Sequence, residues 1–318
     1  MLGFPASNAP ADEVARIVYA SRSNVQASVY AEMERIRASA LRHNGPLGVA
    51  TALLHQSGWF VQWKEGPGEV LRRLMARVAT DPRHHHLRIV HASRGPRLLS
   101  GPWSMAIVQC ADSAEAFARR VDRVHAAATV GRPDSPPAVW RRLSTPLDHP
   151  GAERQDEPRA FVRVLACSAR GDGAFDLVRR LARRHRQPVV RRRFAGPRDL
   201  DVGTDYVDLD DDGRLLRVIA MARRGLALPL TQAFLPDYSH LALLLSGDPG
   251  ADLLLVRRMA LACGGASPAP VLVGVGLPAR QQVALAAVAR GHGLCWQAVE
   301  AGDGGLAAWD ALRPLLAG

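Results

Sequence analysis

One segment in the middle of the chain constrains the fold more than any other feature. Residues 131–159, GRPDSPPAVWRRLSTPLDHPGAERQDEPR, are dense in proline, glycine and charge and show no sustained hydrophobic period. Proline and glycine interrupt both helices and strands, so such a stretch is typical of a linker. We therefore predict a linker over residues 129–159, which separates a domain at 14–128 from a second domain at 160–318.

Strands and helices alternate before this linker. Runs of β-branched and aromatic residues are separated by segments whose apolar residues recur every three to four positions. Gln56-Ser57-Gly58 suits a hairpin turn, Asn24 is a plausible helix cap, and Pro82 ends the second helix. The order βαββαββ predicts a ferredoxin-like α+β domain with two helices on one face of a mixed sheet. The expected strands are 16–21, 47–55, 59–66, 87–93 and 103–109, and the expected helices are 25–42, 68–80 and 113–127.

The second half carries a different pattern. FVRVLAC, LLRVIAM, HLALLLS and APVLVGVG are almost continuously apolar, as expected of strands buried on both faces of a sheet. Helical stretches separate these runs, which predicts a separate α/β domain with a mostly parallel sheet. The expected helices are 175–184, 253–262, 280–289 and 305–316.

Five polar or aromatic residues of the first half need a chemical explanation. Tyr19 lies on the first expected strand and Gln62 on the third, and Asn44 precedes the second. Arg77 and Asp81 are four positions apart near the end of the second helix, so they should share a face. Taken singly, each has an ordinary structural explanation, such as a surface ion pair for Arg77 and Asp81.

Together with their surroundings, these residues resemble a known family. RIVYAS, HNGPLGV, WFVQWKEG, DPRHHHLR and PWSM occur in the order and spacing of BLUF domains (blue light using FAD), and the resemblance covers most of residues 16–109. It implies FAD between the two N-terminal helices, with Tyr19 as the photoactive tyrosine and Gln62 as the switching glutamine. The other roles that it implies are contacts to the flavin from Asn44, Arg77, Asp81 and His43, a cleft wall at Val49, and signal relay through Trp103 and Met105.

The chemistry of the pair suits a buried flavin. An unsatisfied polar group in a dry cleft costs roughly 1–3 kcal/mol, and an amide can both donate and accept hydrogen bonds. The family mechanism implies that light drives an electron and a proton from Tyr19 to the flavin and that both return after Gln62 has rearranged. The changed hydrogen bonds would then re-aim the strand that carries Trp103 and Met105. Three departures from the family pattern are Ala50-Thr51, where Thr-Gly is usual, His43, where a second asparagine is common, and Lys64.

The start of the second domain, LACSARGDGAFDLVRR, resembles a Ras-like P-loop GTPase whose signature has decayed, over about residues 160–316. Ala174 and Phe175 occupy the positions of the lysine and the hydroxyl residue that hold phosphate and magnesium. The resemblance implies a GTPase-shaped module that binds no nucleotide productively. An unrelated α/β output domain is the alternative.

The net charge of the chain does not identify its binding partner. The net charge of +11 comes almost entirely from arginine, and the densest cluster comprises Arg179, Arg180, Arg183, Arg184, Arg186 and Arg191 to Arg193. One hypothesis is a light-regulated nucleic-acid-binding regulator that uses this cluster. No aromatic residues interleave to stack on bases, which favours a solvated surface instead.

The leading hypothesis is therefore a blue-light photoreceptor that is not an enzyme. No nucleophile–base pair, metal-ligand spacing or intact phosphate loop is evident in the second half. Signal output would pass through an unidentified protein partner of residues 160–318, and a homodimer also stays open.

Several sequence features argue against metal and membrane. Adjacent residues of a strand point to opposite faces, so His84, His85 and His86 cannot all bind one ion. The four cysteines have no CxxC spacing and are expected to be buried thiols. No apolar run approaches the roughly 18–20 residues of a membrane span, and the N-terminus does not look like a secretory signal. We expect a cytoplasmic protein without a membrane partner.

Overall fold

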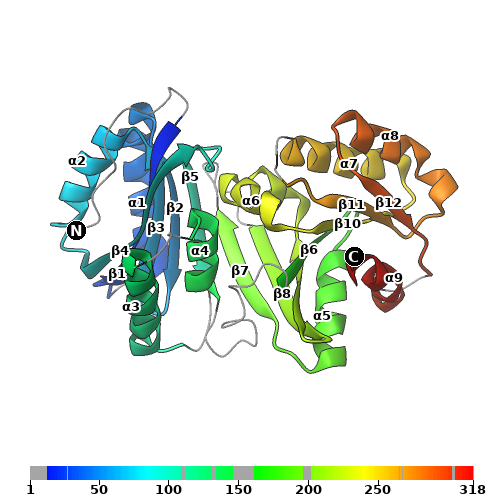
Figure 1. The fold of residues 1–318 in the computed structure, drawn as a ribbon, viewed down its shortest axis with the longest axis horizontal. Coiled ribbons are helices and arrows are strands. Elements are labelled where there is room, and N and C mark those ends of the chain that lie inside the picture. The colour runs from blue at the N-terminus through cyan, green and yellow to red at the C-terminus, as the bar shows by residue number, and fades with distance from the viewer. Residues whose placement is uncertain are drawn as a thin grey trace. The chain divides into compact units, whose positions relative to one another are not determined.

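The computed structural model divides the chain into two compact units, which are described separately (Figure 1). It describes residues 13–26, 28–108, 112–130, 134–145, 161–195, 202–264, 266, 268–302 and 305–317. Of these, the residues up to 145, 193–195 and 228–233 belong to the first unit, and the others to the second.

The sheet of the first unit has the strand order β5-β2-β3-β1-β4. Strand β3 pairs antiparallel with β1 and β2, β1 also pairs antiparallel with β4, and β2 pairs parallel with β5. With helices after β1 and β3, this confirms the predicted βαββαββ order and the ferredoxin-like fold. The elements are β1 (Glu13–Ser23), α1 (Val29–His43), the short η1 (Gly45–Leu47), β2 (Ala50–Gln56), β3 (Trp59–Gly66), α2 (Gly68–Val78), β4 (His84–Pro96), β5 (Trp103–Val108) and α3 (Ala114–Val130).

The expected hairpin joins β2 to β3. Its two loop residues, Ser57 and Gly58, both have positive φ angles, of 50° and 73°. This is the requirement of the tight turn whose twist matches that of the flanking strands, and glycine meets it without a side-chain clash.

The two helices α1 and α2 cover one face of this sheet. Met33 of α1 packs with Phe60, Trp103 and Met105, whereas Leu71 of α2 packs over β1. Figure 1 shows α4 on the opposite side of the sheet from α1 and α2. The first unit therefore buries both faces of its sheet.

The helix α4 (Pro136–Ser144) was not expected, because it lies within the segment that we predicted as a linker. Ser135 caps it by accepting a hydrogen bond from the Ala138 amide at 3.4 Å. Its first residue is a proline, which a helix tolerates there because the missing N–H would have no partner in the first turn. Trp140 is buried and its ring lies 6.4 Å from that of Trp63 on β3. The prolines thus begin a helix here, and only part of 129–159 lies among the described residues.

The start of α1 also differs from the expectation. The cap is Ser28, whose hydroxyl accepts a hydrogen bond from the Ala31 amide at 3.3 Å. Asn24 instead donates its side-chain amide to the Pro82 carbonyl at 2.9 Å and contacts His85 at 2.7 Å. Strand β1 continues to Ser23, so Asn24 lies too early to begin the helix.

The second unit is built on a mostly parallel sheet, as predicted, with the strand order β12-β11-β10-β6-β9-β8. All neighbouring pairs in it are parallel except β8 with β9. Its strands are β6 (Phe161–Ser168), β8 (Val202–Asp211), β9 (Arg214–Met221), β10 (His240–Leu244), β11 (Val271–Val275) and β12 (Trp296–Val299); β7 (Val190–Ala195) is divided between the units.

Helices cover both faces of the second sheet. Leu177, Leu181 and Trp309 place α5 and α9 in one core cluster, whereas Leu255 and Leu285 place α7 and α8 in the other. The bounds are α5 (Gly173–His185), η2 (Arg223–Ala227), α6 (Pro229–Phe234), η3 (Leu235–Asp237), α7 (Pro249–Cys263), η4 (Ala279–Gln281), α8 (Val283–Gly291), α9 (Gly305–Leu312) and η5 (Arg313–Ala317). Within the described ranges, none of these helices or those of the first unit combines the length and apolar character that crossing a bilayer demands.

A buried ion pair crosses the hairpin of β8 and β9. Arg217 and Asp208 are register partners, with Nε–Oδ1 and Nη2–Oδ2 distances both of 2.7 Å. The guanidinium also lies over the rings of Phe161 and Tyr206. Strand β8 continues to Asp211, and the hairpin turns at Asp212 and Gly213, both with positive φ.

We expect Arg217→Met to lower the free energy of unfolding by about 3–5 kcal/mol, because the Asp208 carboxylate would remain buried without this cation. Urea unfolding followed by circular dichroism measures the change. Arg214→Met is the matched control, because its pair with Asp211 is partly exposed and should contribute at most about 1 kcal/mol. Equal losses in the two variants would contradict the assignment.

Candidate functional site

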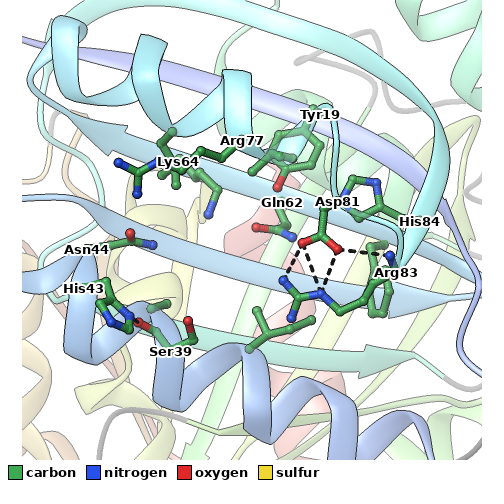
Figure 2. A pocket seen from close by; sticks show the side chains of 15 residues that line it. Tyr19, Ser39, His43, Asn44, Gln62, Lys64, Arg77, Asp81, Arg83 and His84 are labelled. Carbon is green, nitrogen blue, oxygen red and sulfur yellow. Dashed lines mark hydrogen bonds and ion pairs between the residues drawn. The ribbon is translucent and has the colours of Figure 1, made fainter.

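A cavity of about 330 Å³ lies between α1 and α2, over strands β1 and β3 (Figure 2). Ligand pockets in proteins commonly measure about 300–1,000 Å³. Apolar side chains of both helices form part of the wall, including Ile36 and Leu74. The polar and charged residues that line it are Tyr19, Ser39, His43, Asn44, Gln62, Lys64, Arg77, Asp81, Arg83 and His84.

The sheet register aligns Tyr19 and Gln62. They are cross-strand partners on β1 and β3, so their side chains point to the same face. The row continues from Gln62 to Leu53 on β2 and from Leu53 to Met105 on β5. The predicted photoactive pair and one predicted relay residue therefore belong to one row of side chains across the sheet.

The Tyr19 hydroxyl is a buried polar group at this site that lacks a hydrogen-bond partner among the described residues. The whole Tyr19 side chain is fully buried. Burial raises the pKa of this phenol, and the carboxylate of Asp81 raises it further. Tyr19 is thus a protonated donor beside a cavity, and a buried donor requires an acceptor.

Two amide side chains and one amine also point into the cavity (Figure 2). Asn44 follows α1, where its backbone N–H donates to the Ala40 carbonyl at 2.8 Å. Its carbonyl accepts from the amides of Leu47 and Val49, each at 3.1 Å. These bonds fix the backbone of Asn44, so that its side-chain amide is held at the cavity wall. Gln62 and Lys64 reach the same space from β3.

Asp81 has a different partner from the one expected. Helix α2 ends at Val78, so Asp81 lies beyond the helix and does not share a face with Arg77. Its carboxylate instead accepts from Arg83, with Nε–Oδ1 at 2.9 Å and Nε–Oδ2 at 3.0 Å (Figure 2). Arg83 also reaches Glu32 of α1 at 3.4 Å. Hydrogen bonds from Arg83 lower the pKa of Asp81.

Sequence reasoning missed Arg83, because the local spacing favoured Arg77 as the partner of Asp81. Arg83 joins the segment after α2 to α1 and thereby closes one side of the cavity. Pro82 was the available signal. The residue before a proline disfavours the helical conformation, so Asp81 should not pair with Arg77 across a helical turn. Arg77 still lines the cavity, from the exposed side of α2.

The remaining predicted site residues divide into two groups. His43 lines the cavity, and its Nδ1 lies 2.9 Å from the Ser39 carbonyl oxygen. Val49, Trp103 and Met105 are buried in the core clusters beside the cavity and do not line it. The Trp103 indole N–H has no hydrogen-bond partner among the described residues. Val49 is therefore placed in the core under α2, whereas Trp103 and Met105 lie under α1.

Lys64 is the only lysine in the sequence, and it is 4% exposed. It is the register partner of Thr51 on β2, which in turn is the partner of Trp103 on β5. The amine donates to the Thr51 hydroxyl at 3.5 Å. Two of the departures from the family pattern, Thr51 and Lys64, are thus in contact with each other. Burial lowers the pKa of Lys64 to about 7.

The histidine run does not assemble a metal site in the described part of the chain, where no three metal-ligating residues cluster. His84 lines the cavity, whereas His85 contacts the Asn24 side-chain oxygen at 2.7 Å.

Residues 14–106 match the BLUF family model, "Sensors of blue-light using FAD". Photoactivated adenylate cyclase subunit beta of Euglena gracilis is 33% identical over 75 residues, which are 23% of this chain and 9% of that protein. The chain thus spans about a tenth of the length of the curated relatives that it matches. A bacterial light-regulated adenylyl cyclase structure is 26% identical, with a TM-score of 0.24 and coverage of 25% and 23% of the two chains. The dark-state structure of BlrB, a BLUF protein, is 22% identical, with a TM-score of 0.28 and coverage of 42% and 93%.

The N-terminal region is thus a BLUF domain, and FAD is its cofactor. The residues of the cavity fit a flavin on physical grounds. The unpartnered Tyr19 hydroxyl supplies a buried donor, and the amides of Gln62 and Asn44 supply both donors and acceptors. Among the described residues that line the cavity, two arginines, Arg77 and Arg83, stand against one carboxylate, Asp81, which favours an electron-rich or anionic ligand.

The buried amine of Lys64 should make stability depend on pH. Its pKa is about 7 in the folded protein and has the ordinary value of 10.5 when unfolded. Between these values the unfolded chain binds more protons, so this group makes stability rise with pH, by roughly 1.4 kcal/mol per pH unit. We expect Lys64→Met to be more stable than the parent at pH 7, by a margin that shrinks toward pH 9.

Urea unfolding of both proteins in flavin-free form, at pH 7, 8 and 9, measures this margin. Groups shared by the two proteins cancel in the difference, so the slope reports Lys64 alone. A margin that stays constant across these pH values would show that the amine is not neutral in the folded protein.

Proposed function

We propose that this chain is a blue-light photoreceptor that binds FAD between α1 and α2. Tyr19 and Gln62 change their hydrogen bonds when the flavin absorbs light. The observation that carries the proposal is the alignment of this pair on one face of the sheet, beside a cavity and with the tyrosine hydroxyl unpartnered.

Bound FAD would supply the absorption of blue light and one-electron redox chemistry. Tyr19 would then give an electron and its hydroxyl proton to the light-excited flavin and regain both once the Gln62 amide has rearranged, so that no net oxidation remains. The raised pKa of Tyr19 keeps the phenol neutral beforehand, so the proton is available at Oη. The Gln62 side chain can accept from one neighbour and donate to another, and a reoriented amide exchanges these roles. The stored signal is this exchange of hydrogen bonds.

The sheet offers a short route for that signal. Leu53 is the only residue between Gln62 and Met105 in their cross-strand row, and Thr51 alone separates Lys64 from Trp103 in the next row. The buried indole N–H of Trp103 has no fixed partner among the described residues, so a second arrangement of this ring would break no existing hydrogen bond. A side chain with two arrangements of similar energy is the kind of element whose equilibrium a local change in hydrogen bonds can shift.

For the second unit we propose signal output by binding a protein partner, without catalysis. The Asp208 carboxylate is engaged by Arg217 inside the β8–β9 hairpin, which removes it as a metal ligand. The Cys167 thiol is buried, and burial raises its pKa to about 12, which disfavours a nucleophile. A strand, loop and helix at β6 and α5 agree with a GTPase-shaped module, with Ala174 buried and Phe175 half-buried where a P-loop needs lysine and a hydroxyl.

The nucleic-acid alternative receives less support from the arginine cluster. Arg179 pairs with Asp172 and Asp176, and Arg184 pairs with Asp310. Arg192 lies over the Tyr206 ring, 4.7 Å from its centroid. Three of the eight arginines are therefore neutralised or packed within the second unit, and less charge remains for a phosphate backbone.

The tyrosine–glutamine pair gives the first test of the photoreceptor. The parent protein should be yellow, and blue light should shift its flavin band slightly to the red, reversibly in darkness. We expect Tyr19→Phe and Gln62→Leu each to retain FAD and to lose this shift, because each removes one member of the hydrogen-bond switch. Absorption spectra before and after illumination measure it.

Tyr30→Phe is the matched control, because Tyr30 is an exposed tyrosine of the neighbouring helix. It should keep the full light-induced shift. A colourless parent protein that takes up no added FAD would end the proposal, as would an undiminished shift in Tyr19→Phe.

The relay makes a separate prediction. Met105→Leu conserves the volume of the buried side chain, so FAD binding and the light-induced shift should be retained. We expect the difference in hydrogen exchange between light and dark in residues 161–192 and 234–317 to fall by about half or more, because the row from Gln62 ends at Met105. An unchanged difference would exclude this route.

A further inference from the structure

A second cavity, of about 480 Å³, lies in the second unit at the carboxyl ends of β6 and β9. Its wall is formed by the end of β6 and the loop that follows, the first turn of α5, the segment after β9, and α7. All of these elements belong to one unit, so the cavity is a feature of that unit alone.

The topology explains why a cavity forms there. After β6 the chain enters α5, which packs on the face containing Leu177 and Val218. After β9 it enters η2, whose Leu226 packs with Leu255 of α7 on the opposite face. The parallel neighbours β6 and β9 thus send their connections to opposite sides of the sheet. Such a point opens a crevice at the carboxyl edge, where parallel α/β sheets bind their ligands.

Among the residues that the structure describes, three arginines line this crevice and no carboxylate does. Arg223 donates to the Ala169 carbonyl and so holds the loop after β6. Arg224 and Arg258 are exposed, and neither pairs with a carboxylate among the residues that the structure describes. They reach the crevice from different elements, η2 and α7. Two guanidinium groups that converge from separate elements suit a phosphate, which they can bind through several N–H donors.

Neighbouring carboxylates are occupied elsewhere. Asp248 pairs with Arg170, and Asp172 lies 3.3 Å from Arg179. Asp252 accepts hydrogen bonds from the Ser246 amide at 2.8 Å and the Ser246 hydroxyl at 2.9 Å. The positive charge of the crevice is therefore not cancelled by the acidic residues nearest in the sequence.

The crevice also has an apolar side. Phe175 is half-buried in the first turn of α5, Met221 ends β9, and Leu254 of α7 is 48% exposed. An exposed leucine beside a partly exposed aromatic ring provides a surface for a flat or apolar group.

We propose that this crevice is a binding site for a phosphorylated small molecule that carries an apolar or aromatic portion, such as a nucleoside phosphate. Arg224 and Arg258 hold the phosphate, Arg223 fixes the loop, and Phe175 contacts the apolar portion. Binding needs no divalent cation, because the arginines neutralise the phosphate themselves. The inference does not depend on the photoreceptor function, since every residue in it belongs to the second unit.

Isothermal titration of the full chain, at constant ionic strength and with EDTA present, tests the site with inorganic phosphate, ribose 5-phosphate, AMP and adenosine. We expect AMP to bind tightest and adenosine weakest. The double variant Arg224→Gln/Arg258→Gln should weaken AMP binding by about a hundred-fold, since two charged hydrogen bonds are lost and each is worth roughly a factor of ten. Phe175→Ala should weaken AMP but leave inorganic phosphate unchanged.

Arg257→Gln/Arg290→Gln is the control that removes the same charge from exposed positions outside the crevice. It should bind AMP like the parent. Equal weakening in the two double variants would reduce the effect to net charge and overturn the site. No binding of any phosphate compound, or binding only when Mg²⁺ is added, would overturn it as well. Equal affinity for AMP and ribose 5-phosphate would refute the apolar contact.

Discussion

The pairing of β1 with β3 is the constraint on which the chemistry of the first unit depends. It places Tyr19 opposite Gln62, and the same ladder places Ile17 opposite Lys64. Because side chains alternate between the faces of a strand, a shift of one residue would turn Tyr19 away from the helices. The buried side chains on both faces of β1 resist such a shift, since it would exchange Ile17 and Tyr19 with Val18 and Ala20. The alignment of Tyr19 with Gln62 is thus secured by ordinary core packing and needs no interaction of its own.

Ion pairs as well as apolar contacts hold the two helices together at the edge of the cavity. Arg83 bridges Asp81, after α2, and Glu32 of α1. Glu32 is buried, so this link is less screened than a surface ion pair. Lys64 and Thr51 lie deeper, on the sheet, where they place a titratable amine in the row beside Gln62. The polar wall of the cavity therefore combines a fixed ion pair at its edge with a group in its floor that changes charge near neutral pH.

Much of the first unit could be predicted from the sequence, because its signals are local. The hairpin at Ser57-Gly58 follows from two residues that accept positive φ, and the order of strands and helices along the chain follows from the hydrophobic patterns. The partner of Asp81 could not be predicted from spacing, because the helix ends three residues earlier and the chain turns back. Helix α4 was missed for a related reason. Proline at a helix start and proline in a linker look alike in sequence, and the burial of Trp140 against Trp63 distinguishes them only in three dimensions.

The positions of the arginines distinguish three roles that the composition does not: stabilising the sheet, pairing on the surface and lining a crevice. Arg217 is buried in the β8–β9 hairpin, where Asp208 and two aromatic rings surround it, so it stabilises the sheet. Arg179 and Arg184 are paired on the surface and contribute little to stability or to binding. Arg224 and Arg258 differ from all of these, because they converge on one crevice without a carboxylate partner in the described residues. A net charge of +11 would suit a nucleic-acid-binding protein equally well. The distribution of its cations argues instead for structural pairs and one small anionic ligand.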